Sequence, residues 1–267
     1  MTGLLPFIQL VSRWRPETRS FHLRTGEMIM TLQDVSMITA LPIEGKPLCM
    51  SIDSEGWRHP MEALIGMSPP EPEVEDGGKK DRVPAGASFT WITANFAHCP
   101  EAANDEVIQT YARVYMWYVI SRTISADRTG KNAPWMWLKA LSVFDNKFSW
   151  GSAALAYLYE QLDEACRRST KDGGIGGCML LLSVASDVNL LYKQCTNEMD
   201  SLTAEQVEWQ PYGAGSSFGD AHMFQLNPIC MQEKHLWLMC CPLICNWAVE
   251  FHLHPPEWVD TDARLHR

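Results

Sequence analysis

The chain has 267 residues and a net charge of −10, with 46% hydrophobic and 20% charged residues. These totals are ordinary for a globular protein with a sizeable buried core, arranged as one large domain or two small ones. A generally acidic surface is repelled by phosphate backbones, which excludes nucleic-acid binding over the whole surface but leaves a local basic patch open.

The cysteines and the first residues favour a reducing compartment. Nine cysteines, an odd number, stand at irregular spacing, and MTGLLPFIQLVSRW carries no basic segment and no small-residue cleavage site. We therefore expect no secretory leader and expect most thiols to be small buried apolar groups. The longest apolar runs fall short of the roughly 18–20 residues that a membrane span needs, so we expect a soluble protein.

The first elements are a short helix and a hairpin. LLPFIQLVSRW, residues 4–14, has an amphipathic pattern that predicts a helix. TRSFHLRTGEM, residues 18–28, alternates around Phe21 and Leu23 and then reaches a turn residue, Gly26. This pattern predicts a short β-hairpin.

A well-marked helix follows in TLQDVSMITALP, residues 31–42. Thr31 is placed to cap its first turn, Asp34 suits the positive end of the helix dipole, and Pro42 is expected to stop it. The apolar side of this helix is predicted to be Leu32, Val35, Ile38 and Leu41.

Residues 66–88 are rich in proline, glycine and acids and predict an exposed insertion loop within one domain. Residues 104–124 predict a core helix that starts at a cap, Asn104 or Asp105. Its apolar face is predicted to be Val107, Tyr111, Val114, Tyr115, Tyr118 and Val119.

The remaining segments are also read mainly as helices. Residues 133–141 predict a short helix, and residues 149–168 predict a long one. The apolar segment 234–251, KHLWLMCCPLICNWAVEF, is read as one helix interrupted by Pro242. The predicted fold class is mainly α: a single helical domain over residues 1–251 with a short N-terminal β-hairpin, and a divergent tail at 252–267. The long helix carries a stripe of Leu155, Leu158, Tyr159 and Leu162.

Arginines gather in the first 25 residues, where Glu17 is the only acid. Two interpretations stay open: a solvated face whose arginines pair with acids elsewhere, or a patch that contacts a partner or nucleic acid. DNA binding through such a patch would weaken with salt at a log–log slope of about −0.9 per neutralised phosphate. The candidate contact residues are Arg13, Arg15, Arg19, Arg24, Arg167, Arg168 and Lys171.

The sequence offers candidate residues for pyridoxal phosphate binding, nucleophilic catalysis and zinc binding. DGGIGGC, residues 172–178, could cradle a phosphate, but no lysine stands in a context suited to pyridoxal phosphate, and a helix-connecting loop is favoured. GSSFGD, residues 215–220, is the nearest approach to a nucleophile loop, and His22 is expected to bond locally in the hairpin. Zinc ligands were considered in Cys240, Cys241, Cys245, His252 and His254, with buried thiols preferred.

Three segments taken together carry a family resemblance. They are RWRPETRSFHLRTGEMIMTLQDVSMITALPIEG, then FSWGSAALAYLYEQLDEACRR with IGGCMLLL, then VEWQPYG. In this order they resemble the plant mobile domain, also labelled aminotransferase-like, over roughly residues 4–250. The motif residues carried over as structural positions are Trp14, Pro16, Glu17, Phe21, His22, Gly26, Glu27, Leu32, Asp34, Pro42, Trp150, Gly151, Gly176, Gly177, Trp209, Pro211 and Tyr212.

The resemblance implies a transposon-derived nuclear protein without catalytic activity or cofactor. It implies a role in transposon silencing, gene expression or meristem development through a phosphatase-like or chromatin protein. The first hypothesis is therefore a non-catalytic interaction module. The alternatives are a DNA-binding, transposon-associated protein that uses the N-terminal arginines, and a truncated copy without function, since the sequence departs from the family pattern after GGCMLLL and after Phe251.

Overall fold

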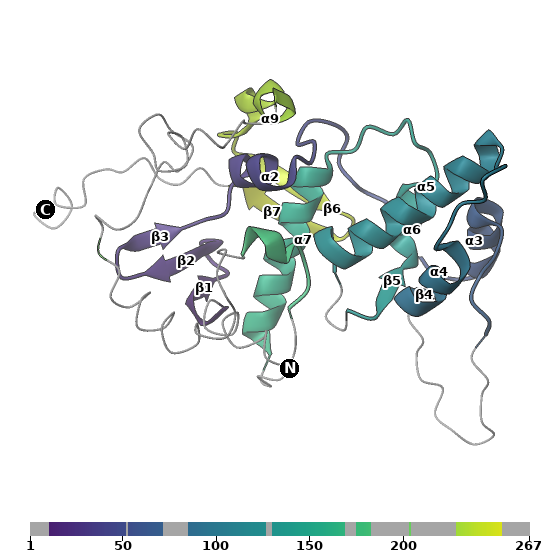
Figure 1. The fold of residues 1–267 in the computed structure, drawn as a ribbon. Helices are drawn as coiled ribbons and strands as arrows, with labels where there is room; N and C mark the ends of the chain where they lie inside the picture. Colours follow the sequence, from purple (N-terminus) through teal and green to yellow (C-terminus); the bar gives the residue numbers. More distant parts are fainter. Residues whose placement is uncertain are drawn as a thin grey trace, which may run out of the picture.

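The computed structural model describes seven parts of the chain, within which helices predominate and the sheets are small (Figure 1). The predicted contact residue Lys171, the motif residues Trp209, Pro211 and Tyr212, and His254 lie outside them. So do residues 4–10 of the first predicted helix, the centre of the predicted loop at 72–84, and the GSSFGD segment. The described residues are 11–51, 53–71, 85–126, 130–168, 175–182, 203 and 228–252.

The N-terminal sheet has three antiparallel strands in the order β1-β2-β3. They are β1 (Trp14–Arg15), β2 (Ser20–Leu23) and β3 (Gly26–Met28). Trp14 pairs with Phe21 across β1 and β2, and the two rings lie 4.9 Å apart with both side chains buried. The predicted hairpin corresponds to β2 and β3, and the segment before Pro16 adds a third strand that anchors this sheet to the core.

Helix α2 (Leu32–Thr39) begins as the sequence predicts. Thr31 and Asp34 form a reciprocal capping box, which satisfies backbone donors of the first turn. The helix ends at Thr39, and its C-cap, Ala40, adopts a left-handed conformation with φ of 54°, two residues before Pro42. The predicted apolar side is wrong at Ile38, which is 49% exposed, because the helix turns Ser36 inward, where its hydroxyl contacts the carbonyl of Cys230.

A second group of elements follows, and α5 is the longest helix in it. The cap predicted at Asn104 is confirmed, because its side chain accepts a hydrogen bond from the Val107 N–H at 3.0 Å. Tyr115 is 69% exposed and Trp117 is buried, so the predicted apolar face is displaced at this point. The group comprises α3 (Arg58–Ile65), β4 (Gly86–Ser88), α4 (Phe89–Phe96), α5 (Asp105–Val119) with its π-helical extension η1 (Ile120–Ile124), β5 (Asn132–Pro134) and α6 (Trp135–Ala140).

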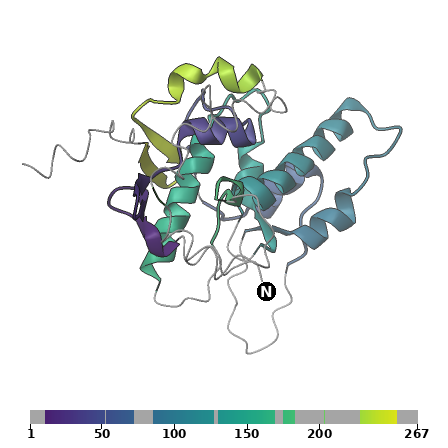
Figure 2. The same ribbon diagram turned by 60° about the vertical axis from the view of Figure 1, so that its left-hand side comes forward.

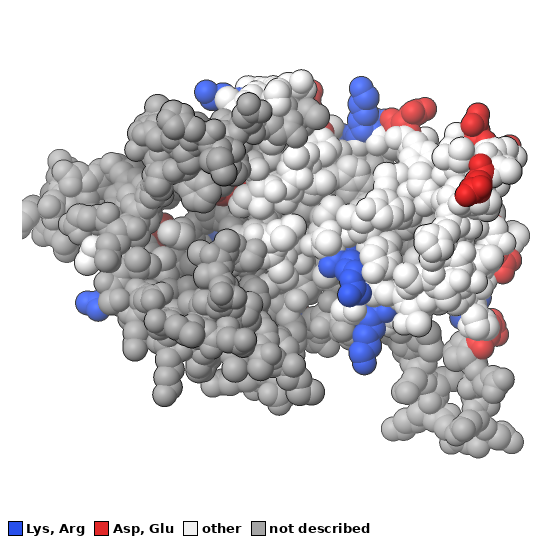
Figure 3. All heavy atoms as spheres, in the orientation of Figure 1, with Lys and Arg blue, Asp and Glu red and all other residues white. Residues whose placement is uncertain are grey.

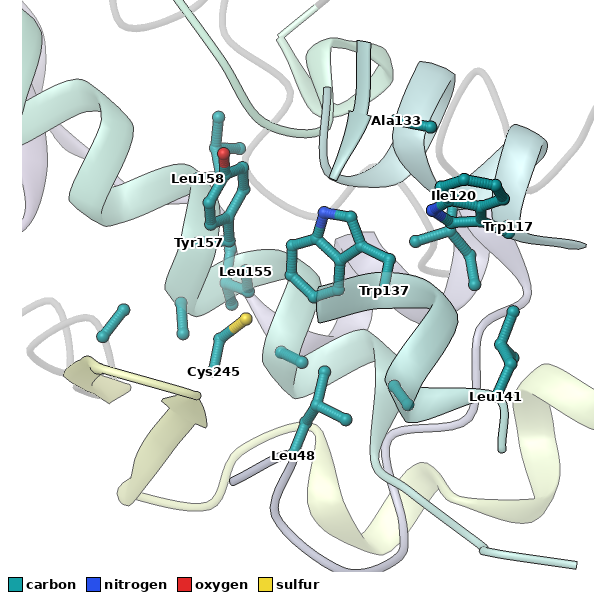
Figure 4. Packing of buried hydrophobic residues seen from close by; sticks show 14 of the residues in the cluster. Leu48, Trp117, Ile120, Ala133, Trp137, Leu141, Leu155, Tyr157, Leu158 and Cys245 are labelled. Carbon is teal, nitrogen blue, oxygen red and sulfur yellow. The ribbon is translucent and has the colours of Figure 1, made fainter. Parts of the chain in front are cut away.

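Helix α7 (Trp150–Arg167) lies between the N-terminal sheet and the group from α3 to α6 (Figures 1 and 2). All four residues of its predicted stripe are fully buried. Tyr157 of α7 meets Trp137 of α6 edge to face at 5.6 Å. Figure 4 shows the two rings facing each other, with Leu155 beside Tyr157 and Trp117 on the far side of Trp137. The remaining elements are η2 (Met179–Leu181), α9 (Pro228–Gln232), η4 (Lys234–Leu236), β6 (Cys241–Cys245) and β7 (Ala248–His252).

The helix predicted for residues 234–251 is wrong. After the short η4 the chain forms the antiparallel hairpin β6–β7, which packs against α7. Ala248 to His252 alternate strictly between buried and exposed, a period of two that belongs to a half-buried strand. Asn246 turns the chain with φ of 54°, and Pro242 stands on an exposed position of the hairpin. β7 also crosses the predicted boundary between domain and tail, since its last residue, His252, is buried.

Candidate functional site

A buried carboxylate on α7 organises the polar part of the core. Asp163 is 1% exposed, and its Oδ1 accepts a hydrogen bond of 2.7 Å from the indole Nε1–H of Trp14. Its Oδ2 accepts from the guanidinium of Arg19 and lies 3.5 Å from Nη2 of Arg167. A buried charge persists only when it is paired and hydrogen-bonded, and Asp163 meets both conditions through residues 144 and 149 positions away in sequence.

Arg19 joins three separate elements. It lies in the β1–β2 turn with φ of 56°, in the left-handed region that non-glycine residues rarely adopt. Besides Asp163 on α7, its Nη2 lies 2.6 Å from Oε2 of Glu250 on β7. Arg19 was a candidate contact residue, and its guanidinium instead pairs with two carboxylates that are 1% and 3% exposed.

The carboxyl of Glu250 has an unusual environment. Burial raises its pKa above the ordinary value of 4.5, the Arg19 guanidinium opposes that shift, and the charge and hydrogen bond of Glu160 raise it further. A group whose pKa is raised in the folded state contributes stability that is complete below its unfolded pKa. That contribution is lost as the pH rises through the folded pKa.

We expect Glu250→Gln to flatten the dependence of stability on pH. The wild-type protein should lose stability relative to the variant as the pH rises above about 4.5, because only the wild type must ionise a buried carboxyl. Urea denaturation at several pH values between about 4.5 and 8 measures the difference. Glu164→Gln, on a half-buried position of α7, is the matched control and should follow the wild type. Parallel wild-type and Glu250→Gln curves would contradict this assignment.

Arg15 and Arg167 lie close to this cluster, since the charges of both act on the Cys166 thiol of α7. Cys166 of α7 contacts the carbonyls of Val11 and Trp14 through its sulfur, so the end of α7 meets the start of the N-terminal sheet. Arg15 is exposed, and its Nη1 donates to two backbone carbonyls, while the Arg167 side chain is 61% exposed. Arg168 pairs with Glu164 at 3.3 Å, Arg13 is half-buried, and Arg24 is exposed in the β2–β3 turn.

The arginines are therefore brought together, but acids accompany them. Asp163, Glu164 and Glu250 pair with arginines of this group, and Glu17 is exposed in the β1–β2 turn. Such a balanced cluster attracts a phosphate backbone less than the count of arginines alone predicts. Figure 3 shows further acidic side chains at the opposite end of the molecule from the N-terminal sheet, the end that carries α3, α4 and α5.

Gly151 and Gly177, from the two glycine-containing motifs, stand where other segments pack closely against α7. The Gly151 N–H donates to the Pro42 carbonyl at 2.8 Å, and a Cβ at Gly151 would lie 2.6 Å from Cγ2 of Ile43. Gly177 has φ of 98°, and a Cβ there would lie 3.1 Å from the Cα of Leu158. Both glycines let another segment approach α7 closely. Gly176, likewise buried, and the half-buried Trp150 belong to the same packing.

The polar residues of the N-terminal hairpin form a small cluster around His22. Oγ1 of Thr18 lies 3.2 Å from Nε2 of His22, and Oε1 of Glu27 also lies 3.2 Å from that same nitrogen. In a nucleophilic triad the base uses one ring nitrogen for the nucleophile and the other for the carboxylate. Here a single nitrogen meets both groups, so the cluster does not match a triad. Ser20 completes it by donating to Glu27 at 2.9 Å, Phe21 packs beneath it, and Pro16 and Glu17 form the preceding turn.

Among the described residues, the candidate zinc ligands Cys240, Cys241, Cys245 and His252 do not form a metal site. Nε2 of His252 accepts the Leu32 N–H at 3.2 Å, which leaves Nδ1 to donate to the Met239 carbonyl at 2.6 Å. His252 thus ties β7 to the start of α2. Within the described residues no three His, Cys, Asp or Glu side chains are arranged to hold a metal ion. Burial raises the pKa of Cys245 to about 12, as expected for an inert thiol.

A shallow hollow of about 480 Å³ opens between α3, α6 and the loop before α3. Two tryptophans and three aliphatic residues form most of its wall, and Nζ of Lys139 donates to the Ser51 carbonyl at its edge. Its two carboxylates, Asp53 and Glu55, lie on exposed loop positions. The lining residues are Ser51, Asp53, Glu55, Trp57, Pro60, Ala63, Leu64, Trp135, Lys139 and Ser142.

The β6–β7 hairpin presents apolar side chains to solvent. Val249 is 55% exposed, Phe251 58% and Trp247 48%, and Pro242 is exposed directly across from Phe251. We call these four residues the outer hairpin face, although the ring of Trp247, at the turn, also meets Tyr157 of α7 edge to face at 6.3 Å. Leu238 and Met239, also exposed, precede this face in the chain. Sequence reasoning missed this surface because it took the segment for a helix, although the alternation in AVEFH was available as a signal.

These features define a mainly helical domain whose described residues hold buried ion pairs, close glycine contacts and an exposed apolar hairpin. The described part of the chain has no helix long and apolar enough to span a membrane. The family model of the plant mobile domain matches residues 6–186, and the chain belongs to this family.

The relatives are longer proteins from Arabidopsis thaliana. Protein MAIN-LIKE 2 is 35% identical over 68% of this chain and 26% of its own length. Protein MAINTENANCE OF MERISTEMS is 34% identical over 68% of this chain and 36% of its own length. Serine/threonine-protein phosphatase 7 long form homolog is 28% identical over 97% of this chain and 21% of its own length. The chain thus spans well under half of these relatives, and no solved structure matches it significantly.

Proposed function

We propose that this domain is a non-catalytic interaction module that docks a protein partner through the outer hairpin face. The observation that carries the proposal is the exposure of Trp247, Val249 and Phe251 on one short hairpin. Contiguous exposed apolar side chains on a folded domain mark interaction surfaces, and aromatic residues are enriched in them. The hairpin is held firmly beneath, because its inner residues Leu243, Cys245 and Ala248 are buried against the core.

The names of the relatives support a proposal about the kind of partner and its setting. One relative is named for meristem maintenance and another is a phosphatase long form homolog. We propose a nuclear role in transposon silencing, gene expression or meristem development, with a phosphatase-like or chromatin protein as the partner. The triad mismatch at His22 and the dispersed cysteines support a module without catalysis.

The test is a pull-down of tagged chain from nuclease-treated plant nuclear extract, read by mass spectrometry. Wild-type protein should recover a phosphatase-like or chromatin protein in stoichiometric amount. The double variant Val249→Ser/Phe251→Ser should recover about tenfold less or lower still, because two central apolar contacts are lost.

The control is Ile108→Ser/Tyr115→Ser, which removes two exposed apolar side chains from α5 and should recover as much partner as the wild type. Recovery of chaperones alone would count against the module and favour a copy without function. If the two double variants recovered equal amounts of partner, the outer hairpin face would not be part of the interface.

DNA binding stays the second candidate, because the structure brings Arg15 and Arg167 to one region where both are exposed. The neighbouring acids, with Arg19 already paired to two of them, make this the weaker proposal.

A further inference from the structure

We propose that the free edge of β7 is a strand-addition site that takes an extended segment of a partner protein with apolar residues at alternate positions. This inference rests on the proposed function and specifies how the partner is held. In strand addition, main-chain hydrogen bonds supply affinity and alternate side chains supply specificity. β7 offers both kinds of contact.

On one side of the β7 backbone, the described part of the chain places no other strand. Among the described residues β7 pairs with β6 alone, whereas β6 is bridged to Leu48, whose carbonyl accepts the Asn246 N–H at 2.6 Å. A two-residue connection makes Cys245 and Ala248 the hydrogen-bonded pair that closes the hairpin. The alternation of an antiparallel ladder then turns the N–H and C=O groups of Val249 and Phe251 away from β6.

The side chains of those two residues are also the exposed apolar ones. Val249 stands across from Ile244, and Phe251 stands across from Pro242, so the outer face is apolar on both strands. A strand added beside β7 would place its own outward residues next to Val249 and Phe251, where neighbouring strands lie about 4.8 Å apart. Apolar residues at alternate positions of the incoming segment would extend this surface.

A second copy of this chain fits the edge poorly. Pairing two β7 strands over their full length through their open groups sets Val249 opposite Phe251 and places Glu250 directly opposite Glu250 of the second copy. Like charges directly opposite one another destabilise a sheet, and Cα atoms in such a pair lie only about 4.5 Å apart. The carboxyl of Glu250 is 3% exposed and already shares its surroundings with Glu160. The edge therefore favours a foreign strand with a neutral or basic residue at this position.

Selection of twelve-residue peptides displayed on phage against the full chain tests the proposal. Enriched peptides should carry apolar residues at alternate positions, and a synthetic representative should bind wild-type protein and the α5 control Ile108→Ser/Tyr115→Ser equally. Val249→Pro should weaken binding about tenfold or more, because proline removes the outward N–H without touching the β6 ladder. N-methylation of alternate backbone amides of the peptide should weaken its binding to the wild-type protein by the same factor of about ten. This measurement tests the same main-chain hydrogen bonds if Val249→Pro does not fold.

The opposite results are equally clear. Enriched peptides without alternation, no enriched peptide, or full binding by folded Val249→Pro would overturn strand addition. Sedimentation would give a further contrary result if the wild-type protein is a dimer and Val249→Pro is a monomer. The edge of β7 would then bind a second copy of this chain, and the proposal of a strand from a different protein would be wrong. If the pull-down still recovers a partner that Val249→Pro binds fully, the interaction module stands and only its mode of docking fails.

Discussion

Replacing Asp163 by alanine is expected to destabilise the fold by about 3–5 kcal/mol, enough to unfold a marginally stable domain. The substitution leaves the Arg19 guanidinium without one of its two carboxylates and leaves the buried indole N–H of Trp14 without its acceptor. Each unsatisfied buried group costs its own desolvation energy. Urea denaturation followed by tryptophan fluorescence measures the change.

Two variants show whether charge or shape carries the effect. Asp163→Asn keeps an acceptor for Trp14 but removes the charge that faces Arg19, and we expect a smaller loss of about 1–3 kcal/mol. Glu164→Ala, one residue along α7, removes a half-buried pair with Arg168 and should cost at most about 1 kcal/mol. A loss from Asp163→Ala no larger than that from Glu164→Ala would show that the buried cluster contributes little to stability.

The sequence predicts the local parts of this fold well. The caps at Thr31 and Asn104 and the buried stripe of α7 follow from patterns within one or two helical turns, where periodicity and capping are decisive. The prediction of the apolar face of α5 is less accurate. Trp117 is buried and Tyr115 is exposed, and this difference depends on which elements surround the helix.

The long-range parts could not be read from the sequence. Asp163 appears there as an ordinary helix acid followed by two arginines, and nothing marks Trp14 and Arg19, about 150 residues earlier, as its partners. The β6–β7 hairpin was missed for a related reason. Its segment is apolar over most of its length, and a short apolar run fits a strand or a buried helix equally well until its alternation is weighed.

The second large effect is expected at Gly86, at the start of β4. A Cβ there would lie 2.1 Å from the carbonyl oxygen of Ala133, a backbone atom of β5 that cannot move aside like a side chain. Its φ of 142° adds a conformation that L-residues avoid. Overpacking costs typically 1–3 kcal/mol and backbone strain a similar amount, so Gly86→Ala should cost about 3–5 kcal/mol.

Gly66→Ala is the matched control, because Gly66 also has a positive φ, 83°, but a Cβ there meets nothing within 4 Å. It should cost only about 1 kcal/mol, the strain of a left-handed helix end. The difference between the variants in urea denaturation isolates the close contact of β4 with β5. That contact sets Ala87 against Ala133, both buried, and so places the starts of α4 and α6 side by side. Equal losses from the two variants would mean that this ladder can separate without disturbing the helices that follow it.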